Sequence, residues 1–471
     1  MSADVVIAGA DLGVGRPQQI RVTLDPVSTI VAIDDRIATA GVEVVDAGGH
    51  AVLPAFTDHH LHLAAMARAG ESVRCGPPDV VDRTQLARAI ANTPPDADGW
   101  IRGTGYVETV AGDLDRSDLD TFEPHRPLRI QHRSGAMWML NSVGVERVGV
   151  ESGDHPGIER DATGRATGRL WRADAWLRSH LPQPRFPSLV DVGTRLRAYG
   201  IAEITDATPD LDDTAIAAIT DAVDDSTLIG TVCLLGVPLG RTLDHPRISV
   251  GPFKIVIADS DLPSLDDLAE RIAAAHHADR SVAVHCVSRV AFALLLAAWD
   301  IVGVRAGDRI EHAGIVPAEA CADLARRGVI VVTQPAFLSD RGDDFLDGSE
   351  ISDHADLYRC GSLINAGVPV ALSSDAPYGP LSPWEAVGAA VERRTASGRV
   401  VGDDDERISV PDALSRHVTP ANDPGGAPRR IAVGESSDLI IADRPLAEVL
   451  ELPGDVRTFG SVIGGVVSIF R

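Results

Sequence analysis

Apolar and polar positions alternate in short segments at both ends of the chain, a pattern typical of β-strands with one exposed face. Residues 1–52 contain four such segments separated by turns: DVVIAGA, QQIRVTL, TIVAIDD and GVEVVDAGGHAVL. The pattern returns within residues 428–471, in SDLIIADRPL, VRTFG and SVIGGVVSIFR. We therefore predict that the two ends of the chain pair to form one small β-sandwich.

Over residues 53–427, short apolar runs alternate with helix-like segments, the form that βα units and a parallel sheet take in a sequence. The candidate strands are HAVLPAFTDHH, GIAEITDAT, LIGTVCLLG, FKIVIAD, SVAVHCV, DRIEHAG, VIVVTQPAF and VPVALSSDAP. Between the later ones lie helix-like segments such as SLDDLAERIAAAHHAD and AEACADLARRG. This order predicts an α/β fold, a (β/α)8 barrel of the TIM type.

The interval from about 65 to 195, between the first and second predicted strands, is too long for a single helix. It contains mixed segments such as WIRGTGYVET and PLRIQHRSGAMWMLNS, so we interpret it as an inserted subdomain. The insert leaves the first strand at its C-terminal end, where barrels of this type place their active sites. We expect it to cover the barrel mouth and to set specificity. The segment VGDDDER, near 401, is expected to be an exposed loop.

The amino-acid composition limits which kinds of protein and partner fit this chain. Hydrophobic residues make up 44% and charged residues 24% of the 471 residues, as in globular proteins, and neither a transmembrane run nor a secretory signal is found. The five cysteines are scattered without a C-x-x-C pair, which fits the cytoplasm and argues against disulfides or a cysteine zinc site. A formal net charge of −25 disfavours nucleic acid and membranes as partners and leaves a small-molecule substrate.

With one exception, the basic residues of this chain are arginines. Of the 43 lysines and arginines, 42 are arginine, and Lys254 is the single lysine. Arginine stays protonated in proteins, whereas lysine can become a neutral amine where its surroundings lower its pKa. Lys254 is therefore a candidate for chemistry that needs an amine.

Metal-ligating side chains occur at the C-terminal ends of the predicted strands, the face where such barrels hold catalytic groups. His60 and His62 end the first strand, and their spacing of two residues directs them to the same side. Neutral imidazoles and carboxylates are the ligands expected for zinc and similar divalent ions. The ordered set predicts a metal centre made of His60, His62, Lys254, His285, His312 and Asp375.

In these features the chain resembles the amidohydrolase superfamily over nearly its whole length. The phrases GDRIEHAG, TQPAFL and SSDAPYGPLSPW are similar to the branch that contains N-substituted formamide deformylase. The resemblance implies that His60, His62 and Asp375 bind the more buried of two divalent metals, with zinc expected. It implies that His285 and His312 bind the second metal, and that Lys254, carboxylated by carbon dioxide, bridges the two.

What the resemblance implies for function is hydrolysis of a carbon–nitrogen bond in an amide, formamide or cyclic amide. A hydroxide shared by the metals would be the nucleophile, and Asp375 would take its proton and pass it to the leaving nitrogen. Many relatives are dimers, so a homodimer is implied as well. Ala136 departs from the histidine that many members of the branch carry, and Ala55 from the usual glycine.

Other residues near the predicted strand ends are candidates for substrate contact or for packing. His59 alternates to the outer face of its strand, so we expect it to pack or to support the ligands. Candidates for substrate contact come from the insert and from the segments that follow the seventh and eighth strands: Arg133, Trp138, Gln334, Phe337, Arg341, Tyr378 and Trp384.

Two other functions remain open from the sequence. A deaminase with one metal would use a similar constellation without a bridging lysine, but it usually has a glutamate after the fifth-strand histidine, where this chain has CVSR. A barrel that has lost catalysis and only binds its ligand would usually lack a metal ligand. All six expected ligands are present in this sequence.

Overall fold

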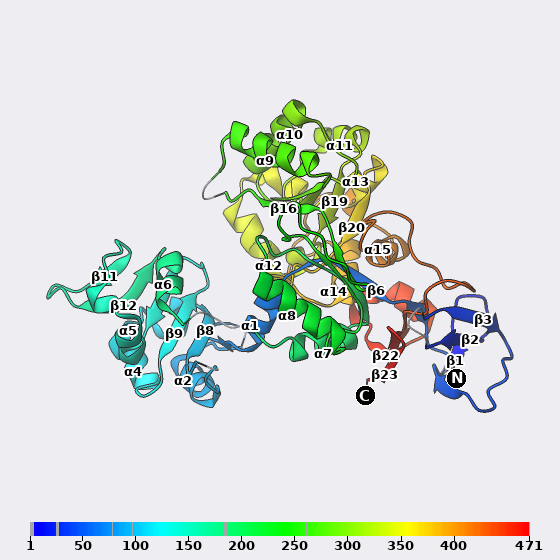
Figure 1. The fold of residues 1–471 in the computed structure, drawn as a ribbon, viewed down its shortest axis with the longest axis horizontal. Coiled ribbons are helices and arrows are strands. Elements are labelled where there is room, and N and C mark those ends of the chain that lie inside the picture. Colours follow the sequence, from blue (N-terminus) through cyan, green and yellow to red (C-terminus); the bar gives the residue numbers. More distant parts are fainter. Residues whose placement is uncertain are drawn as a thin grey trace. The chain divides into compact units, whose positions relative to one another are not determined.

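The computed structural model describes residues 4–24, 28–77, 79–96, 98–182, 186–259 and 262–470. The chain divides into two compact units, residues 1–63 with 189–471, and residues 64–188. In the described residues, no helix has both the length and the apolar character needed to span a membrane. Figure 1 shows the elements of each unit.

The first unit contains two four-stranded sheets built from the ends of the chain. One has the order β3-β2-β1-β4, and the other, β23-β22-β21-β5, joins a strand from the N-terminal part to three from the C-terminal part. Their alternating apolar residues, such as Val5 and Ile7 on one sheet and Leu439 and Ile441 on the other, share one core. The strands are β1 (Asp4–Ala10), β2 (Gln18–Thr23), β3 (Ile30–Asp34), β4 (Glu43–Asp46), β5 (Val52–Pro54), β21 (Leu439–Ala442), β22 (Thr458–Ile463) and β23 (Val466–Ile469). Strand β22 joins the predicted segment VRTFG to the beginning of the predicted segment SVIGGVVSIFR, and the rest of that segment forms β23.

Nine parallel strands form the remaining two sheets of this unit, ordered β15-β14-β13-β6 and β16-β17-β18-β19-β20. Each of the eight candidate barrel strands overlaps one of them, whereas β15 was not predicted. They are β6 (Phe56–Leu61), β13 (Ile201–Asp206), β14 (Thr231–Leu234), β15 (Ile248–Val250), β16 (Phe253–Val256), β17 (Val282–Cys286), β18 (Arg309–His312), β19 (Ile330–Thr333) and β20 (Val370–Leu372).

Two seams join these sheets. At the first, β15 pairs with β14 and β16 pairs with β17, so one stretch of chain interrupted at Gly251–Pro252 borders both sheets. Proline has no N–H to continue the ladder, which explains the interruption. At the second seam, the Asp375 N–H donates to the His60 carbonyl at 2.8 Å. A continuous ladder around all strands, expected for a closed barrel, is not found within the described ranges.

Helices follow most of the parallel strands and bury one apolar face against the sheets. In α9 the Ser264 side chain caps the N-terminus by accepting the Asp267 N–H, and Leu268, Ile272 and Ala275 join the core. The main helices of the unit are α7 (Val190–Ala198), α8 (Asp213–Asp224), α9 (Leu265–His277), α10 (Arg289–Val302), α11 (Cys321–Arg327), α12 (Ala336–Gly348), α13 (Gly361–Asn365), α14 (Pro383–Glu392), α15 (Val410–His417) and α16 (Leu446–Glu451).

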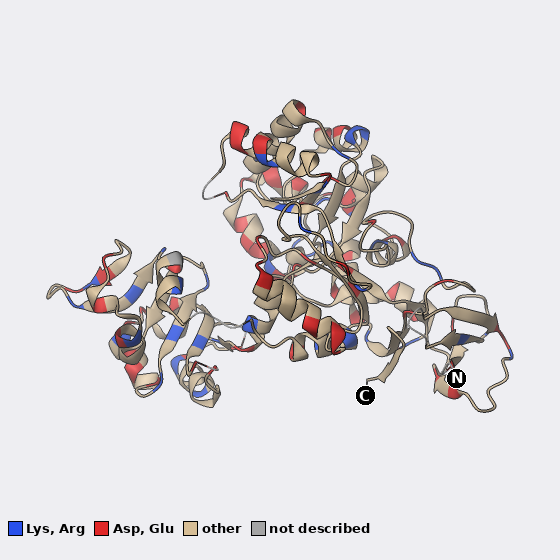
Figure 2. Cartoon of the chain, viewed as in Figure 1, with Lys and Arg blue, Asp and Glu red and all other residues tan. Residues whose placement is uncertain are grey.

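Charge is distributed unevenly between the units. The first unit contains 27 basic and 51 acidic residues, and the second contains 16 basic and 17 acidic residues. Acidic side chains recur along the helices of the first unit, including α8 and α9 (Figure 2). The negative field therefore belongs to the unit that contains the predicted metal ligands, where it attracts cations.

The second unit has a six-stranded sheet of order β11-β12-β10-β9-β8-β7, with short helices around it. Its core includes Ile101, Leu128 and Ile130 from the central strands. The strands are β7 (Val73–Arg74), β8 (Ile101–Tyr106), β9 (Leu128–His132), β10 (Met137–Leu140), β11 (Ile158–Arg160) and β12 (Ala166–Trp171). The helices are α1 (Leu63–Gly70), α2 (Arg83–Asn92), α3 (Glu108–Ala111), α4 (Arg116–Phe122), α5 (Ser142–Val148) and α6 (Asp174–His180).

The prediction of an exposed loop near 401 is wrong for Glu406, whose side chain is 1% exposed. Its carboxylate accepts the Cys360 N–H at 2.9 Å and pairs with the Arg359 guanidinium. Burial of a carboxylate requires such partners, and these lie 46 and 47 residues away in the chain. Local composition therefore could not reveal them.

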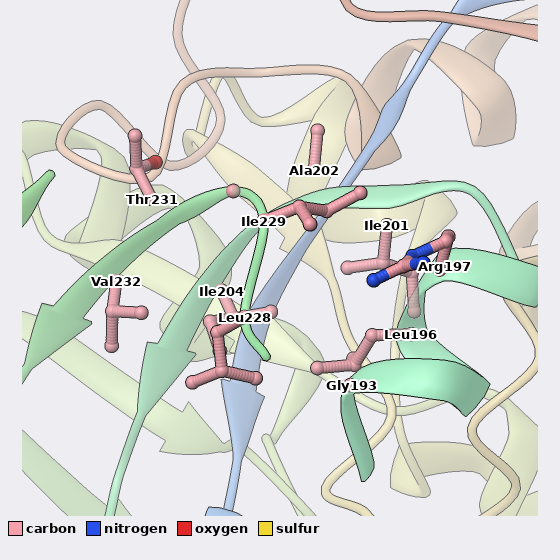
Figure 3. Close-up of a pocket in the computed structure, with 11 residues that line it drawn as sticks. Gly193, Leu196, Arg197, Ile201, Ala202, Ile204, Leu228, Ile229, Thr231 and Val232 are labelled. Carbon is pink, nitrogen blue, oxygen red and sulfur yellow. The ribbon is translucent and has the colours of Figure 1, made fainter. Parts of the chain in front are cut away.

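A small hollow lies at the N-terminal ends of β13 and β14, beside α7 (Figure 3). Apolar residues such as Leu196, Ile201 and Val232 line most of it, and Arg197 is also at its edge. Ile201 begins β13, whereas the polar residues described below lie beyond the other end of that strand. The hollow is therefore separate from the predicted metal centre.

Candidate metal centre

The predicted histidine and aspartate ligands lie at or just beyond the C-terminal ends of parallel strands, whereas Lys254 is the second residue of β16. His60 lies within β6, and His62 follows its last residue; Asp375 lies three residues after β20. The side chain of Asp58 ties these two strands together by accepting the N–H groups of His60 at 3.1 Å and Ser374 at 3.2 Å.

Three of these side chains meet at one point. The Asp375 Oδ1 atom lies 3.2 Å from His62 Nε2 and 3.5 Å from His60 Nε2. These ligand atoms lie within 4.8 Å of one another, a grouping that could hold a metal ion. The 3.5 Å approach is an ion-pair distance without hydrogen-bond geometry, which leaves His60 Nε2 and Asp375 Oδ1 buried without a hydrogen bond to the described residues. Such atoms usually have a partner, and a cation bound between them would supply one.

The other predicted ligands adjoin this group. The His312 ring lies 4.7 Å from the His60 ring and 4.5 Å from the His285 ring, measured between centroids. Lys254 lies in β16 and is 4% exposed, and its Nζ atom makes no hydrogen bond with the described residues. Burial lowers the pKa of Lys254 to about 8, which favours the neutral amine that carboxylation requires.

The histidines are held in the neutral form that ligates metals. Burial, with the charge of Lys254, lowers the pKa of His285 to about 4. Burial lowers the pKa values of His60 and His312 well below their ordinary values. Neutral imidazoles and carboxylates are typical zinc ligands, so the donor set fits divalent metal ions.

Hydrogen bonds to their second nitrogens orient three of the imidazoles. His60 Nδ1 bonds the Glu311 carboxylate, His62 Nδ1 lies 3.3 Å from Thr208 Oγ1, and His312 Nδ1 lies 2.9 Å from Gln334 Oε1. Such partners fix the ring orientation and tautomer of metal-binding histidines. Sequence reasoning did not identify Glu311 or Thr208, although Glu311 directly precedes His312.

The candidate substrate-contact residues that follow the seventh and eighth predicted strands, β19 and β20, differ in exposure and contacts. Gln334 is fully buried, and its amide also donates to Ser373 at 2.9 Å, so it positions His312. Phe337 is 3% exposed, and the Arg341 guanidinium lies 4.9 Å from its ring. Tyr378 is 56% exposed, and its ring packs edge-on against His62 at 5.5 Å. Among these candidates, Tyr378 and Arg341 are exposed, whereas Gln334 and Phe337 are buried.

Four other residues singled out in the sequence lie in packed or separate surroundings. Trp384 is 1% exposed, with its ring edge-on to Phe56 at 5.0 Å, which argues for a packing role. Fully buried His59 bonds Thr419 Oγ1 through Nε2 at 2.9 Å, so its packing role is confirmed. In the second unit, Trp138 is 7% exposed and donates to Asp174 at 2.8 Å, and Arg133 follows β9.

Comparison with known proteins adds to this geometry. The model of the amidohydrolase family matches residues 43–458. N-substituted formamide deformylase of Arthrobacter pascens is 27% identical over 476 residues, which cover 86% of each chain. A metal-dependent hydrolase from Pyrococcus furiosus has a TM-score of 0.71 at 20% identity, over 93% of this chain and 98% of that one. Another, from Pyrococcus horikoshii OT3, has a TM-score of 0.70 at 18% identity, over 90% and 96% of the two chains.

Proposed function

The chain belongs to the amidohydrolase family, and we propose that it hydrolyses an amide, formamide or cyclic amide at the centre around Asp375. As a member, it is a hydrolase of carbon–nitrogen bonds other than peptide bonds. The proposal depends above all on the convergence of buried His60 Nε2 and Asp375 Oδ1 without hydrogen-bond partners among the described residues.

The donor set divides into two groups. His60, His62 and Asp375 would hold one divalent ion, and His285 and His312 would hold a second. Lys254, as a carbamate formed with carbon dioxide, would bridge them. Bound zinc ions would supply a hydroxide nucleophile near neutral pH and polarise the substrate carbonyl.

The chain's own groups complete the proton transfers. The Asp375 carboxylate would accept the proton that the attacking water loses and donate it to the departing nitrogen. The carbon–oxygen bond forms first, and the carbon–nitrogen bond breaks when the electrons on the former carbonyl oxygen return, which yields a carboxylic acid and an amine. Hydrogen bonds to Glu311 and Gln334 keep His60 and His312 in place during these steps.

The substrate class is proposed from similarity and from one difference. The relative from Arthrobacter pascens is named for N-substituted formamides, which makes N-formyl and N-acyl amines the first compounds to test. Ala136 stands where many members of that branch have histidine, so we propose a substrate different from theirs. Its contacts would come from the exposed Tyr378 and from Phe337 and Arg341.

The inserted unit is the proposed source of further specificity. Its segment begins one residue after Leu63, close in sequence to the ligand His62, so its path starts at the strand end that holds the metal ligands. Arg133 and Trp138 are its proposed contributors. Exchange of residues 64–188 for the corresponding segment of a relative should change the order of preferred substrates, whereas unchanged preferences would contradict this role.

Metal content and turnover test the proposal together. Protein loaded with zinc and bicarbonate should hold two equivalents of metal by elemental analysis and should hydrolyse members of an N-formyl and N-acyl panel. Asp375→Asn should abolish turnover, whereas Asp403→Asn, in an exposed segment, should not. A constant single equivalent would favour the deaminase alternative. Metal-loaded protein without turnover on any carbon–nitrogen substrate would favour the binding protein.

A further inference from the structure

Tyr358 has a strained backbone beside the proposed metal centre. Its φ is +43°, in the left-handed region that bulky residues rarely adopt. Positive φ values also occur at His312 (+71°), Ala313 (+49°) and Asp375 (+53°). Such strain persists only where the surroundings impose it, often at active sites.

Specific bonds hold Tyr358 in this conformation. Its N–H donates to the Gly314 carbonyl at 2.9 Å, two residues beyond His312. Its carbonyl accepts the Arg393 guanidinium at 2.8 Å, and the same guanidinium reaches the Leu357 carbonyl at 2.7 Å. Arg393 is fully buried, and among the described residues its guanidinium donates to backbone carbonyls, including that of Val401 at 3.0 Å. A buried cation thus fixes the chain at Tyr358 against the end of β18.

Aromatic packing fixes the ring as well. The Tyr358 ring lies 5.6 Å from Phe337, edge-on, and 5.7 Å from Phe345. Phe337 in turn packs against Gly379, because an added Cβ at Gly379 would lie only 2.8 Å from the phenyl ring. Gly379 belongs to the loop that begins with Asp375, so the tyrosine ring is anchored to both strand-end segments.

The hydroxyl group is the part of Tyr358 that this packing leaves unexplained. The residue is 3% exposed, and no hydrogen bond joins its hydroxyl to a described residue, yet the oxygen is not among the fully enclosed polar atoms that lack a partner. Tyrosine hydroxyls in buried surroundings usually find a partner. Burial first, and the negative charge of Asp375 as well, raise the pKa of Tyr358, so the hydroxyl keeps its proton and can donate it in a hydrogen bond.

We propose that the Tyr358 hydroxyl is a catalytic hydrogen-bond donor to the oxygen of the substrate carbonyl. As water oxygen bonds to the carbonyl carbon, the carbonyl π electrons move to that oxygen, and the tyrosine stabilises the anion without losing its proton. This assignment rests on the proposed hydrolytic function. A donor role explains together why the Tyr358 backbone is strained, why Arg393 is buried against it, and why the hydroxyl has no partner among the described residues.

Tyr358→Phe is the direct test, because it keeps both ring contacts and removes only the hydroxyl. With the best substrate of the panel, kcat should fall roughly 100-fold, as for loss of one oxyanion donor, while KM and metal content stay near wild type. Tyr199→Phe is the matched control, since Tyr199 is the C-cap that follows α7 and precedes the N-terminal end of β13. A tyrosine that only packs would leave kcat within about twofold of wild type, and that result would overturn the proposal.

Binding of inorganic phosphate to zinc-loaded protein gives a readout that does not depend on turnover. Calorimetry should show about tenfold weaker binding to Tyr358→Phe than to wild type and Tyr199→Phe. Equal affinities, or no binding by any of the three, would overturn the role of the hydroxyl. Failure of wild type to hydrolyse any panel compound would instead count against the proposed function, and phosphate binding would still decide the role of Tyr358.

Discussion

The Nδ1 atom of His60 is hydrogen-bonded to the Glu311 carboxylate, and neither side chain has any exposed surface. The other carboxylate oxygen of Glu311 accepts the Arg309 guanidinium, so the acid is held from two sides. A proton on Nδ1 leaves the Nε2 lone pair of His60 directed toward Asp375, 3.5 Å away. This relationship would orient His60 for the proposed metal ion before the ion binds.

Glu311→Gln should weaken metal binding without removing a ligand. The amide keeps the size of the side chain but offers less basic support to His60, and loss of such a partner typically costs 10–100-fold in metal affinity. Competition with a chelator measures this change. Glu319→Gln, at an exposed position in the segment that follows the same strand, is the control and should bind zinc like wild type. Equal affinity of both variants would show that Glu311 does not act through His60.

The sequence could predict the strand ends but not every side chain around them. Strict alternation directs Glu311 and His312 to opposite faces of β18. In the structure His312 has a positive φ, and both side chains reach His60: Glu311 is hydrogen-bonded to it, and the His312 ring lies beside its ring. Burial of Glu406 could not be predicted, and for Trp384 the sequence left packing and substrate contact both open, because burial depends on partners such as Arg359 and Phe56 that are distant in sequence. The local sequence pattern identifies residues of the types that bind metals. The residues that contact and support them are known only once the fold is known.

The buried imidazole of His417 should make stability sensitive to acid. Burial lowers the pKa of His417 to about 4, below its ordinary 6.5, so between these values the unfolded chain binds the extra proton. Stability is therefore lost as pH falls from 6.5 toward 4, by about 2 kcal/mol between pH 7 and pH 5 from this group alone. Between pH 7 and pH 5, urea unfolding should show that His417→Leu loses about 2 kcal/mol less unfolding free energy than wild type does. The exposed variant His277→Leu should lose as much as wild type. An identical pH dependence in His417→Leu would refute the prediction.

Trp384 should matter for folding more than for substrate choice. It is 1% exposed, packs edge-on against Phe56, and its indole N–H lies 3.3 Å from Thr458 Oγ1. Trp384→Ala should lower the free energy of unfolding by about 3–5 kcal/mol, the usual cost of emptying such a site. Denaturant unfolding measures this loss. Val290→Ala, at an exposed position, should cost little, and a stable Trp384→Ala with altered substrate preference would restore the tryptophan as a contact residue.

Lys254→Arg separates a bridging carbamate from an ordinary buried cation. Arginine serves at every other basic position of this chain, so a merely structural cation should tolerate the change. A bridge could not tolerate it, because the guanidinium stays protonated and would bring positive charge toward two metal ions. Metal content should fall from two equivalents, and turnover should drop by more than the roughly 100-fold that loss of an outer partner costs.

Two further variants make the lysine test specific. Arg271→Lys, the reverse exchange at an exposed position of α9, should leave metal content and turnover unchanged. Lys254→Ala should lose activity as Lys254→Arg does, but added acetate or propionate should restore part of it by supplying the missing bridging carboxylate. Rescue should be absent in Lys254→Arg, because the guanidinium still fills the space. Full activity of Lys254→Arg would remove the bridge from the mechanism and make a single-metal centre the better description.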